Sequence, residues 1–181
     1  IWGGGTKPAV KTLQEKYGIT GKTISAVDLI HGIGIAAGLQ PAHVEGATGY
    51  LDTNYAGKVE ACKKSLEDND FVFLHIEAPD ESGHEGNVDH KLKAIEDFDA
   101  KVVGPVAEDL SKKYDYRILV MPDHPTPCST MTHTSDPVPF VFYDSNGNNS
   151  GLLTDKDQTY SEKSAESSKN YIEHGHVLMD L

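Results

Sequence analysis

The sequence predicts an α/β fold with a largely parallel sheet. Strand-like apolar runs alternate with helix-like segments along the chain, which is the pattern of this fold class. Two runs, Phe71–Ile76 and Arg117–Met121, are almost continuously apolar, as strands covered on both faces are. The length of 181 residues is close to that of one domain. We therefore expect a single α/β domain over residues 1–181.

The first half of the chain contains helix, strand and turn patterns. In order, these are a short helix over Pro8–Tyr17 closed by Gly18, a strand over Lys22–Val27, a helix over Asp28–Leu39, a turn at Gly46–Gly49 and a helix over Thr53–Leu66. The turn is a weak candidate for holding a phosphate, because glycine turns are common.

The second half contains the longest predicted helix, over Val88–Tyr114. Apolar residues recur there at steps of three and four, and Gly104-Pro105 is expected to kink the helix. The remaining patterns are a strand over Pro139–Tyr143, a turn-rich loop over Ser145–Gly151 and a polar helix over Ser161–His174.

Composition excludes several classes of protein. The chain has 28 Asp and Glu against 16 Lys and Arg, a net charge of −12, and it lacks the basic stripe that nucleic-acid binding requires. No apolar run approaches the roughly 20 residues that cross a bilayer. The two cysteines form no CxxC pair, which argues against a disulfide scaffold. We expect a soluble, cytoplasmic protein.

Metal-ligand residues cluster around the strand-like runs. Asp80 and His84 follow the first run, Asp123 and His124 follow the second, and His133 precedes the next predicted strand. Ligands of parallel α/β sheets bind outside the carboxyl ends of the strands, so these clusters can converge. Imidazoles mixed with carboxylates suit manganese, zinc or iron rather than calcium. The sequence therefore predicts a metal site.

The pair Asp123 and His124 requires a turn. Adjacent residues of a regular strand point to opposite faces, so Pro122 and Pro125 must bend the chain for both side chains to reach neighbouring metals. Two neighbouring ions would form a clamp for a phosphoryl group. His75, inside a strand, is expected to be a core residue or to support the metal site.

Five segments follow one another in a characteristic order: Ile24–Gly34, Gly46–Tyr55, His75–Gly86, Pro122–Pro127 and His133–Phe140. Together they resemble the C-terminal half of the archaeal-type, cofactor-independent phosphoglycerate mutases of the alkaline phosphatase superfamily. The resemblance implies a three-layer α/β/α sandwich with a mainly parallel sheet. It also implies interconversion of 3-phosphoglycerate and 2-phosphoglycerate through a phosphoserine, without 2,3-bisphosphoglycerate.

The same resemblance implies two divalent ions. Asp80, His84 and His133 would hold one ion, and Asp123 and His124 the other. Manganese is the leading candidate, with zinc or magnesium as alternatives. His31 stands where the family often has Lys, and is a candidate phosphate contact.

The chain departs from the family at its beginning. The nucleophilic Ser and a further Asp ligand of the family precede the matched region, so we expect this chain to be a fragment that is inactive alone. Its first residues, Ile1–Gly5, have the pattern of a strand end entering a loop. Hydroxyl residues within the chain do not match the nucleophile's motif: these are Ser82, Thr126, Ser129 and Thr132.

Two alternatives stay open. The chain could belong to another enzyme of the superfamily: a phosphatase, a phosphopentomutase or a phosphonate-processing enzyme. It could instead be a non-catalytic metal-binding module. The segments Ile24–Gly34 and Gly46–Tyr55 favour the mutase.

Overall fold

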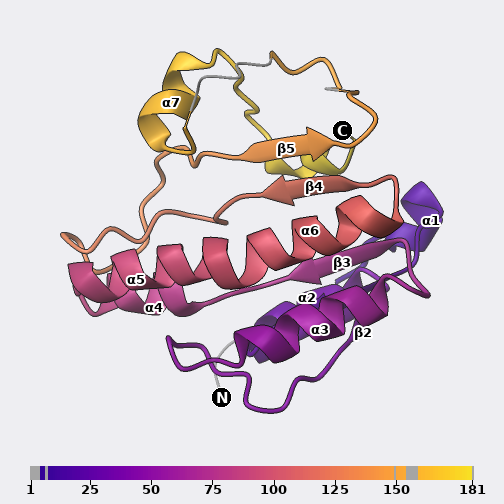
Figure 1. Cartoon of the computed structure of the whole chain (residues 1–181), viewed down its shortest axis with the longest axis horizontal. Helices are drawn as coiled ribbons and strands as arrows, with labels where there is room; N and C mark the ends of the chain where they lie inside the picture. Colours follow the sequence, from indigo (N-terminus) through magenta and orange to yellow (C-terminus); the bar gives the residue numbers. More distant parts are fainter. Residues whose placement is uncertain (1–4, 7, 149, 154–158, 181) are drawn as a thin grey trace.

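The computed structural model describes residues 5–6, 8–148, 150–153 and 159–180. Helices and strands alternate along the chain as far as α4, and a run of helical segments then leads to the paired strands β4 and β5 (Figure 1). In chain order they are α1 (Leu13–Tyr17), β1 (Gly21–Ile24), α2 (Asp28–Ala36), β2 (Gln40–Pro41), α3 (Tyr55–Ser65), β3 (Phe71–Leu74), α4 (Ala78–His84), α5 (Val88–Phe98), the π-helix η1 (Asp99–Val103), α6 (Gly104–Lys113), β4 (Arg117–Val120), β5 (Val141–Asp144), α7 (Glu162–Ser167) and the 3₁₀-helix η2 (Gly175–Asp180). The α/β class is confirmed.

The described strands form two sheets. Strands β2, β1 and β3 make a parallel sheet in that order, with Ile24 of β1 opposite Leu74 of β3. Strands β4 and β5 form a separate antiparallel pair, in which Val120 lies opposite Val141. The antiparallel pairing matters for function, because the end of β4 and the beginning of β5 then lie together.

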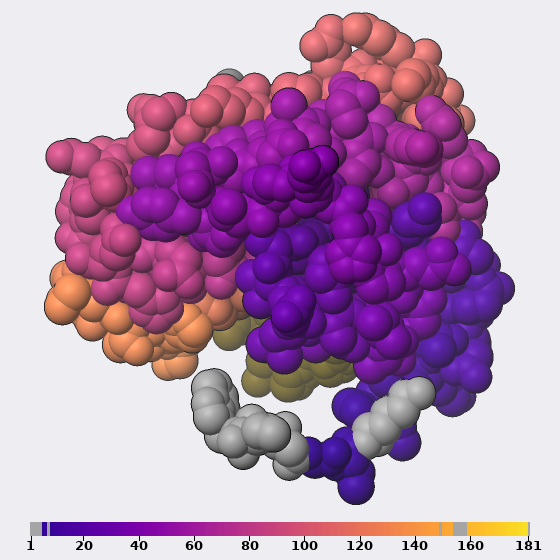
Figure 2. All heavy atoms as spheres, turned by 90° about the horizontal axis from the view of Figure 1, so that it is seen from below, coloured from indigo at the N-terminus to yellow at the C-terminus, as the bar shows by residue number. Residues whose placement is uncertain are grey.

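The core joins β1 to the helices α3, η1 and α6. Ile24 is fully buried and packs in one cluster with residues of these helices, namely Tyr55, Val59, Cys62, Val102, Val106 and Leu110. Burial of each aliphatic side chain contributes roughly 1.5–3 kcal/mol. Helices α2 and α3 both contact β1, and the first half of the chain, from indigo to magenta, forms most of the face seen from below (Figure 2).

All five predicted helices are shorter in the structure: α2 ends at Ala36 rather than Leu39, α3 spans Tyr55–Ser65 rather than Thr53–Leu66, and the other three differ as follows. The predicted helix over Val88–Tyr114 is one continuous rod (Figure 1), but the π-helical turn η1 divides it just before Pro105 and it ends at Lys113. The first helix is shorter than expected, although Gly18 does end it with φ 73°. The predicted helix over Ser161–His174 ends at Ser167, and Lys169 adopts a positive φ of 61° that a helix cannot accommodate.

The sequence predicts that β3 and β4 are more deeply buried than the structure shows. Phe73 of β3 is 44% exposed and Leu119 of β4 is 37% exposed, so neither strand is covered on both faces by the described residues. The apolar side chains at the beginning of the predicted helix over Val88–Tyr114 are also exposed, namely Val88, Leu92 and Ile95. Their apolar character is therefore not explained by the core of this chain alone.

Some expectations concern other parts of the chain. The strand end expected at the beginning falls mainly on residues 1–4, and the loop over Ser145–Gly151 includes residue 149; both positions lie outside the described residues.

Each helix in the described ranges falls short of the length or apolar character that a bilayer crossing needs.

Candidate metal centre

Helix α4 places Asp80 and His84 on one face. It begins directly after the turn that follows β3, with Pro79 in its first turn, where a missing N–H costs no hydrogen bond. Residues four apart on a helix are neighbours, and His84 Nε2 lies 3.2 Å from Asp80 Oδ2. The sequence predicted this pair at a strand end but not the helix that aligns it.

The segment after β4 turns Asp123 and His124 toward each other. No regular strand continues past Val120, and His124 Nε2 lies 3.3 Å from Asp123 Oδ2. This is the bent geometry that the two flanking prolines predict, since a strand would have separated the side chains.

His133 reaches the other clusters because β5 runs antiparallel to β4. Its Nε2 lies 3.0 Å from His84 Nε2 and 3.4 Å from Asp80 Oδ1. Its ring also packs on that of His124, with the centroids 3.7 Å apart. The structure therefore brings all five predicted residues together.

The donor set fits a divalent cation. One ligand atom from each of Asp80, His124 and His133 lies within 4.8 Å of the other two. The Nε2 atoms of His84 and His133, 3.0 Å apart, can share one hydrogen bond, or both lone pairs can point at one ion. Nitrogen and carboxylate donors in this arrangement suit manganese, zinc or iron.

Backbone and side-chain contacts orient these ligands. His84 Nδ1 lies 3.1 Å from the carbonyl oxygen of Met131. An N–H at Nδ1 donates to that carbonyl and leaves Nε2 free to bind a metal. Thr126 Oγ1 donates to Asp80 Oδ1 and lies 3.3 Å from His124 Nδ1.

A second chain of polar contacts reaches the site from Ser25, the residue that follows β1. Ser25 Oγ lies 3.0 Å from His75 Nδ1, and His75 Nε2 lies 3.1 Å from Glu77 Oε2. Burial lowers the pKa of His75, because desolvation disfavours the charged ring. Burial, together with the charges of Asp80 and Glu81, raises the pKa of Glu77. His75 thus connects the sheet to an acidic group beside Asp80.

His31 lies away from solvent in α2. It is 8% exposed, with Nδ1 3.0 Å from Thr23 Oγ1 and Nε2 3.1 Å from the carbonyl oxygen of Ser25. Both ring nitrogens therefore already have partners within the chain. A phosphate would have to replace one of these bonds, and the contact stays a prediction.

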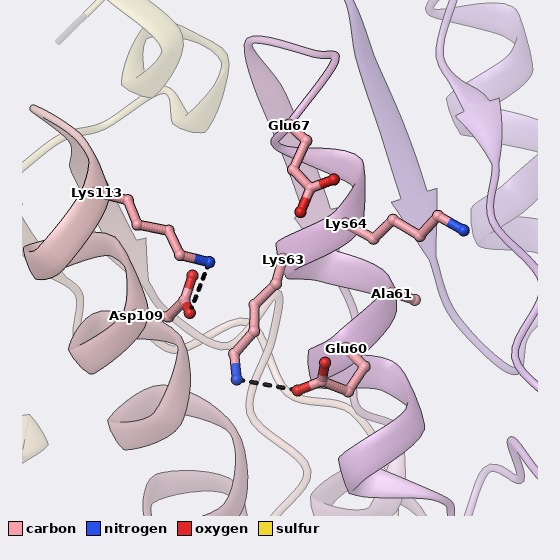
Figure 3. A pocket seen from close by; sticks show the side chains of 7 residues that line it. All are labelled: Glu60, Ala61, Lys63, Lys64, Glu67, Asp109 and Lys113. Atoms are coloured by element: carbon pink, nitrogen blue, oxygen red, sulfur yellow. Dashed lines mark hydrogen bonds and ion pairs between the residues drawn. The ribbon is translucent and has the colours of Figure 1, made fainter.

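A cavity of about 1130 Å³ adjoins the second pair of ligands. Asp123 and His124 are among its lining residues, together with apolar residues that include Met121, Phe140 and Tyr160. By contrast, the pocket between α3 and α6 is lined mainly by charged groups already paired, Lys63 with Glu60 and Lys113 with Asp109 (Figure 3). Of these two pockets, the larger one reaches the ligand pair Asp123 and His124.

Sequence reasoning did not identify Glu77 and Lys58 near this edge of the sheet, and it considered Thr126 only as a nucleophile. Glu77 and Thr126 lie within the same motifs as the ligands, which was the signal that could have found them. Lys58 of α3 is 0% exposed, and its Nζ has no hydrogen-bond partner among the described residues. Burial lowers the pKa of Lys58, and the charge of Glu77 opposes that shift. No signal in the sequence marks a helical lysine as buried.

The family follows from comparison with known proteins. The sequence matches the metalloenzyme superfamily over residues 1–170. The chain belongs to this superfamily. Membership in the metalloenzyme superfamily indicates divalent metal ions as cofactors, and it is consistent with the cluster of imidazoles and carboxylates at the strand ends.

Relatives within the superfamily are named as mutases. The chain is 53% identical to a probable 2,3-bisphosphoglycerate-independent phosphoglycerate mutase of Geobacter sulfurreducens, over 100% of this chain and 44% of that protein. It is 56% identical to the 2,3-bisphosphoglycerate-independent phosphoglycerate mutase of Methanosarcina acetivorans, over 79% of this chain and 36% of the relative. The chain thus spans less than half the length of these relatives.

Solved structures agree on the fold. The PH0037 protein from Pyrococcus horikoshii matches with a TM-score of 0.77 and 31% identity, over 91% of this chain and 42% of that one. The cofactor-independent phosphoglycerate mutase from Thermoplasma acidophilum matches with a TM-score of 0.59 at 22% identity, over 91% and 36%, and this likeness concerns the fold alone. The expected alkaline phosphatase-like α/β fold is confirmed.

Proposed function

We propose that this chain is the metal-holding part of a 2,3-bisphosphoglycerate-independent phosphoglycerate mutase. The observation that carries the proposal is the convergence of Asp80, His84, Asp123, His124 and His133 at the strand ends, with His84 Nε2 and His133 Nε2 3.0 Å apart. The names of the relatives from Geobacter sulfurreducens and Methanosarcina acetivorans point to the same reaction.

The ligands divide into two sets. Asp80, His84 and His133 would hold one divalent ion, since their side-chain atoms lie within 3.0–3.4 Å of one another. Asp123 and His124, 3.3 Å apart, would contribute to the second. Manganese is the preferred candidate for both sites, with zinc or magnesium as alternatives.

In the proposed reaction, the role of this chain is to hold the metal ions and to position the substrate beside them. Bound divalent ions supply positive charge to phosphoryl oxygens and lower the pKa of a coordinated hydroxyl. The hydroxyl would be a serine on a segment outside this chain, to which the phosphoryl group is transferred and from which it returns to the other position of glycerate. The cavity beside Asp123 and His124 is large enough to hold phosphoglycerate.

Domain organisation and location follow from the same proposal. Residues 1–181 would form one metal-binding α/β domain of a longer enzyme, and the reaction belongs to glycolysis in the cytoplasm. Neither nucleic acid nor membrane is expected as a partner, in keeping with the net charge of −12.

The test is an assay of the longer enzyme that contains this chain. After loading with Mn²⁺, it should interconvert 3-phosphoglycerate and 2-phosphoglycerate without added 2,3-bisphosphoglycerate, and His133→Ala should abolish turnover. Strict dependence on 2,3-bisphosphoglycerate would refute the proposal. Hydrolysis of a generic phosphate ester without mutase turnover would favour another superfamily enzyme, and the absence of any phosphotransfer would favour a metal-binding module.

A further inference from the structure

Thr126 lies between the two proposed ligand sets. It follows His124 by two residues and is only 4% exposed. Its hydroxyl donates to Asp80 Oδ1 of the first set and lies 3.3 Å from His124 Nδ1 of the second. Among the described residues, it is the hydroxyl that bonds to both sets.

The hydrogen-bond chemistry fixes the direction of this contact. A threonine hydroxyl has one hydrogen and two lone pairs, and an ionised carboxylate can only accept. The hydrogen therefore goes to Asp80, and Thr126 Oγ1 accepts from an N–H at His124 Nδ1. This leaves His124 Nε2, which faces Asp123 Oδ2 at 3.3 Å, as the nitrogen that can bind a metal.

The backbone around Thr126 is held in place from α4 and α5. Lys91 Nζ donates to the carbonyl oxygens of both Pro79 and Thr126, at 2.7 and 3.2 Å. Gly83 permits the close approach, because a Cβ at this position would lie 2.2 Å from the Thr126 carbonyl oxygen. The hydroxyl is therefore fixed relative to the helix that carries Asp80 and His84.

We propose that Thr126 is a positioning residue that couples the two metal sites. The inference rests on the proposed function, because it requires both ligand sets to bind ions. With an ion bound, Asp80 of the first set would be fixed, and through it the Thr126 hydroxyl and the ring of His124 would be held in place. Such coupling is reciprocal, so an ion in the second set also favours binding in the first.

The test is calorimetric titration of this chain with Mn²⁺ alone and with Zn²⁺ alone. Thr126→Val keeps the shape but removes the hydroxyl, and it should weaken binding at both sites by about 10- to 100-fold, the usual effect of losing a group that orients metal ligands. Thr126→Ser should restore nearly wild-type affinity. Thr130→Val is the matched control, because the exposed Thr130 hydroxyl bonds only to the carbonyls of Pro127 and Thr132 in the described loop.

A spectroscopic measurement separates positioning from general packing. In the Zn²⁺-bound protein, the N–H at His124 Nδ1 should exchange slowly with solvent because Thr126 accepts it, and Thr126→Val should make this exchange fast. A circular dichroism spectrum checks that each variant is folded. If Thr126→Val does not fold, Thr126→Ala replaces it in both measurements.

The outcomes distinguish this inference from the proposed function. Wild-type protein that binds neither ion would contradict the metal centre and the coupling together. Wild-type binding with unchanged affinities in Thr126→Val, or a failure of Thr126→Ser to restore them, would overturn the coupling alone.

Discussion

Gly83→Ala tests whether the close contact between α4 and the Thr126 segment holds the site together. The added Cβ would lie 2.2 Å from the Thr126 carbonyl oxygen and 2.9 Å from Thr126 Cγ2. Since ordinary contacts of this kind begin near 3.4 Å, α4 or the segment must move by about 1 Å. That movement would carry Asp80 and His84 away from Thr126.

Two opposing contributions determine how far Gly83→Ala changes the free energy of unfolding. Replacing glycine by alanine inside a helix stabilises by about 0.5–1 kcal/mol. Overpacking against a fixed backbone costs about 1–3 kcal/mol, so the middle of the two ranges gives a loss of roughly 1 kcal/mol in the free energy of unfolding of Gly83→Ala. For a chain of this size, that loss lowers Tm by roughly 2–4 °C.

The assay is urea unfolding of the metal-free protein followed by circular dichroism, together with Mn²⁺ titration. Gly32→Ala is the matched control, because Gly32 is also helical and an added Cβ there meets nothing within 4 Å. Gly32→Ala should stabilise by about 0.5–1 kcal/mol and leave Mn²⁺ affinity unchanged. The reasoning fails if Gly83→Ala is as stable as Gly32→Ala and binds Mn²⁺ as tightly as wild type.

Three further predictions concern single residues. His84→Ala should weaken the first metal site more than the second in calorimetry, and an equal loss at both would reject the division of ligands. Burial raises the pKa of the Cys62 thiol to about 11, so Cys128, which is partly exposed, should react first with a thiol reagent at pH 8; faster reaction of Cys62 would contradict its burial. Lys58→Met removes a buried, unpartnered ammonium and should stabilise by about 1 kcal/mol or more at neutral pH. Because the folded pKa of Lys58 is below its ordinary value of 10.5, the unfolded state binds more protons between the two values and wild-type stability rises there with pH. The advantage of the variant should shrink as pH approaches 10.5, and a constant advantage in urea unfolding would refute this origin.

The sequence was informative where local chemistry decides structure. Gly18 ends α1 with a positive φ of 73°, as a residue without a Cβ readily does. The prolines around Asp123 and His124 do bend the chain. The ligand types and their positions after two strand-like runs were enough to predict that the pair Asp80 and His84 lies near the pair Asp123 and His124.

Other features depend on contacts that the sequence does not contain. His133 precedes a strand, and only the antiparallel direction of β5 brings it to the end of β4. The length and composition of Val141–Asp144 do not specify that direction. The role of Thr126 likewise requires knowing that α4 packs on its carbonyl, a contact between residues 83 and 126.

Local sequence patterns also misjudged how deeply the strand side chains are buried. The apolar runs around Phe73 and Leu119 predict strands covered on both faces, yet both side chains are more than one-third exposed. Periodicity reports that a face is apolar, but it does not report which segment covers that face.

Anomalous X-ray diffraction from crystals of this chain soaked in Mn²⁺ tests the central claim most directly. The account predicts two ions about 4 Å apart, one bound by Asp80, His84 and His133 and the other by Asp123 and His124, with imidazole nitrogens about 2.0–2.3 Å away. Anomalous peaks that lie elsewhere, or the absence of any peak among these five side chains, would contradict it.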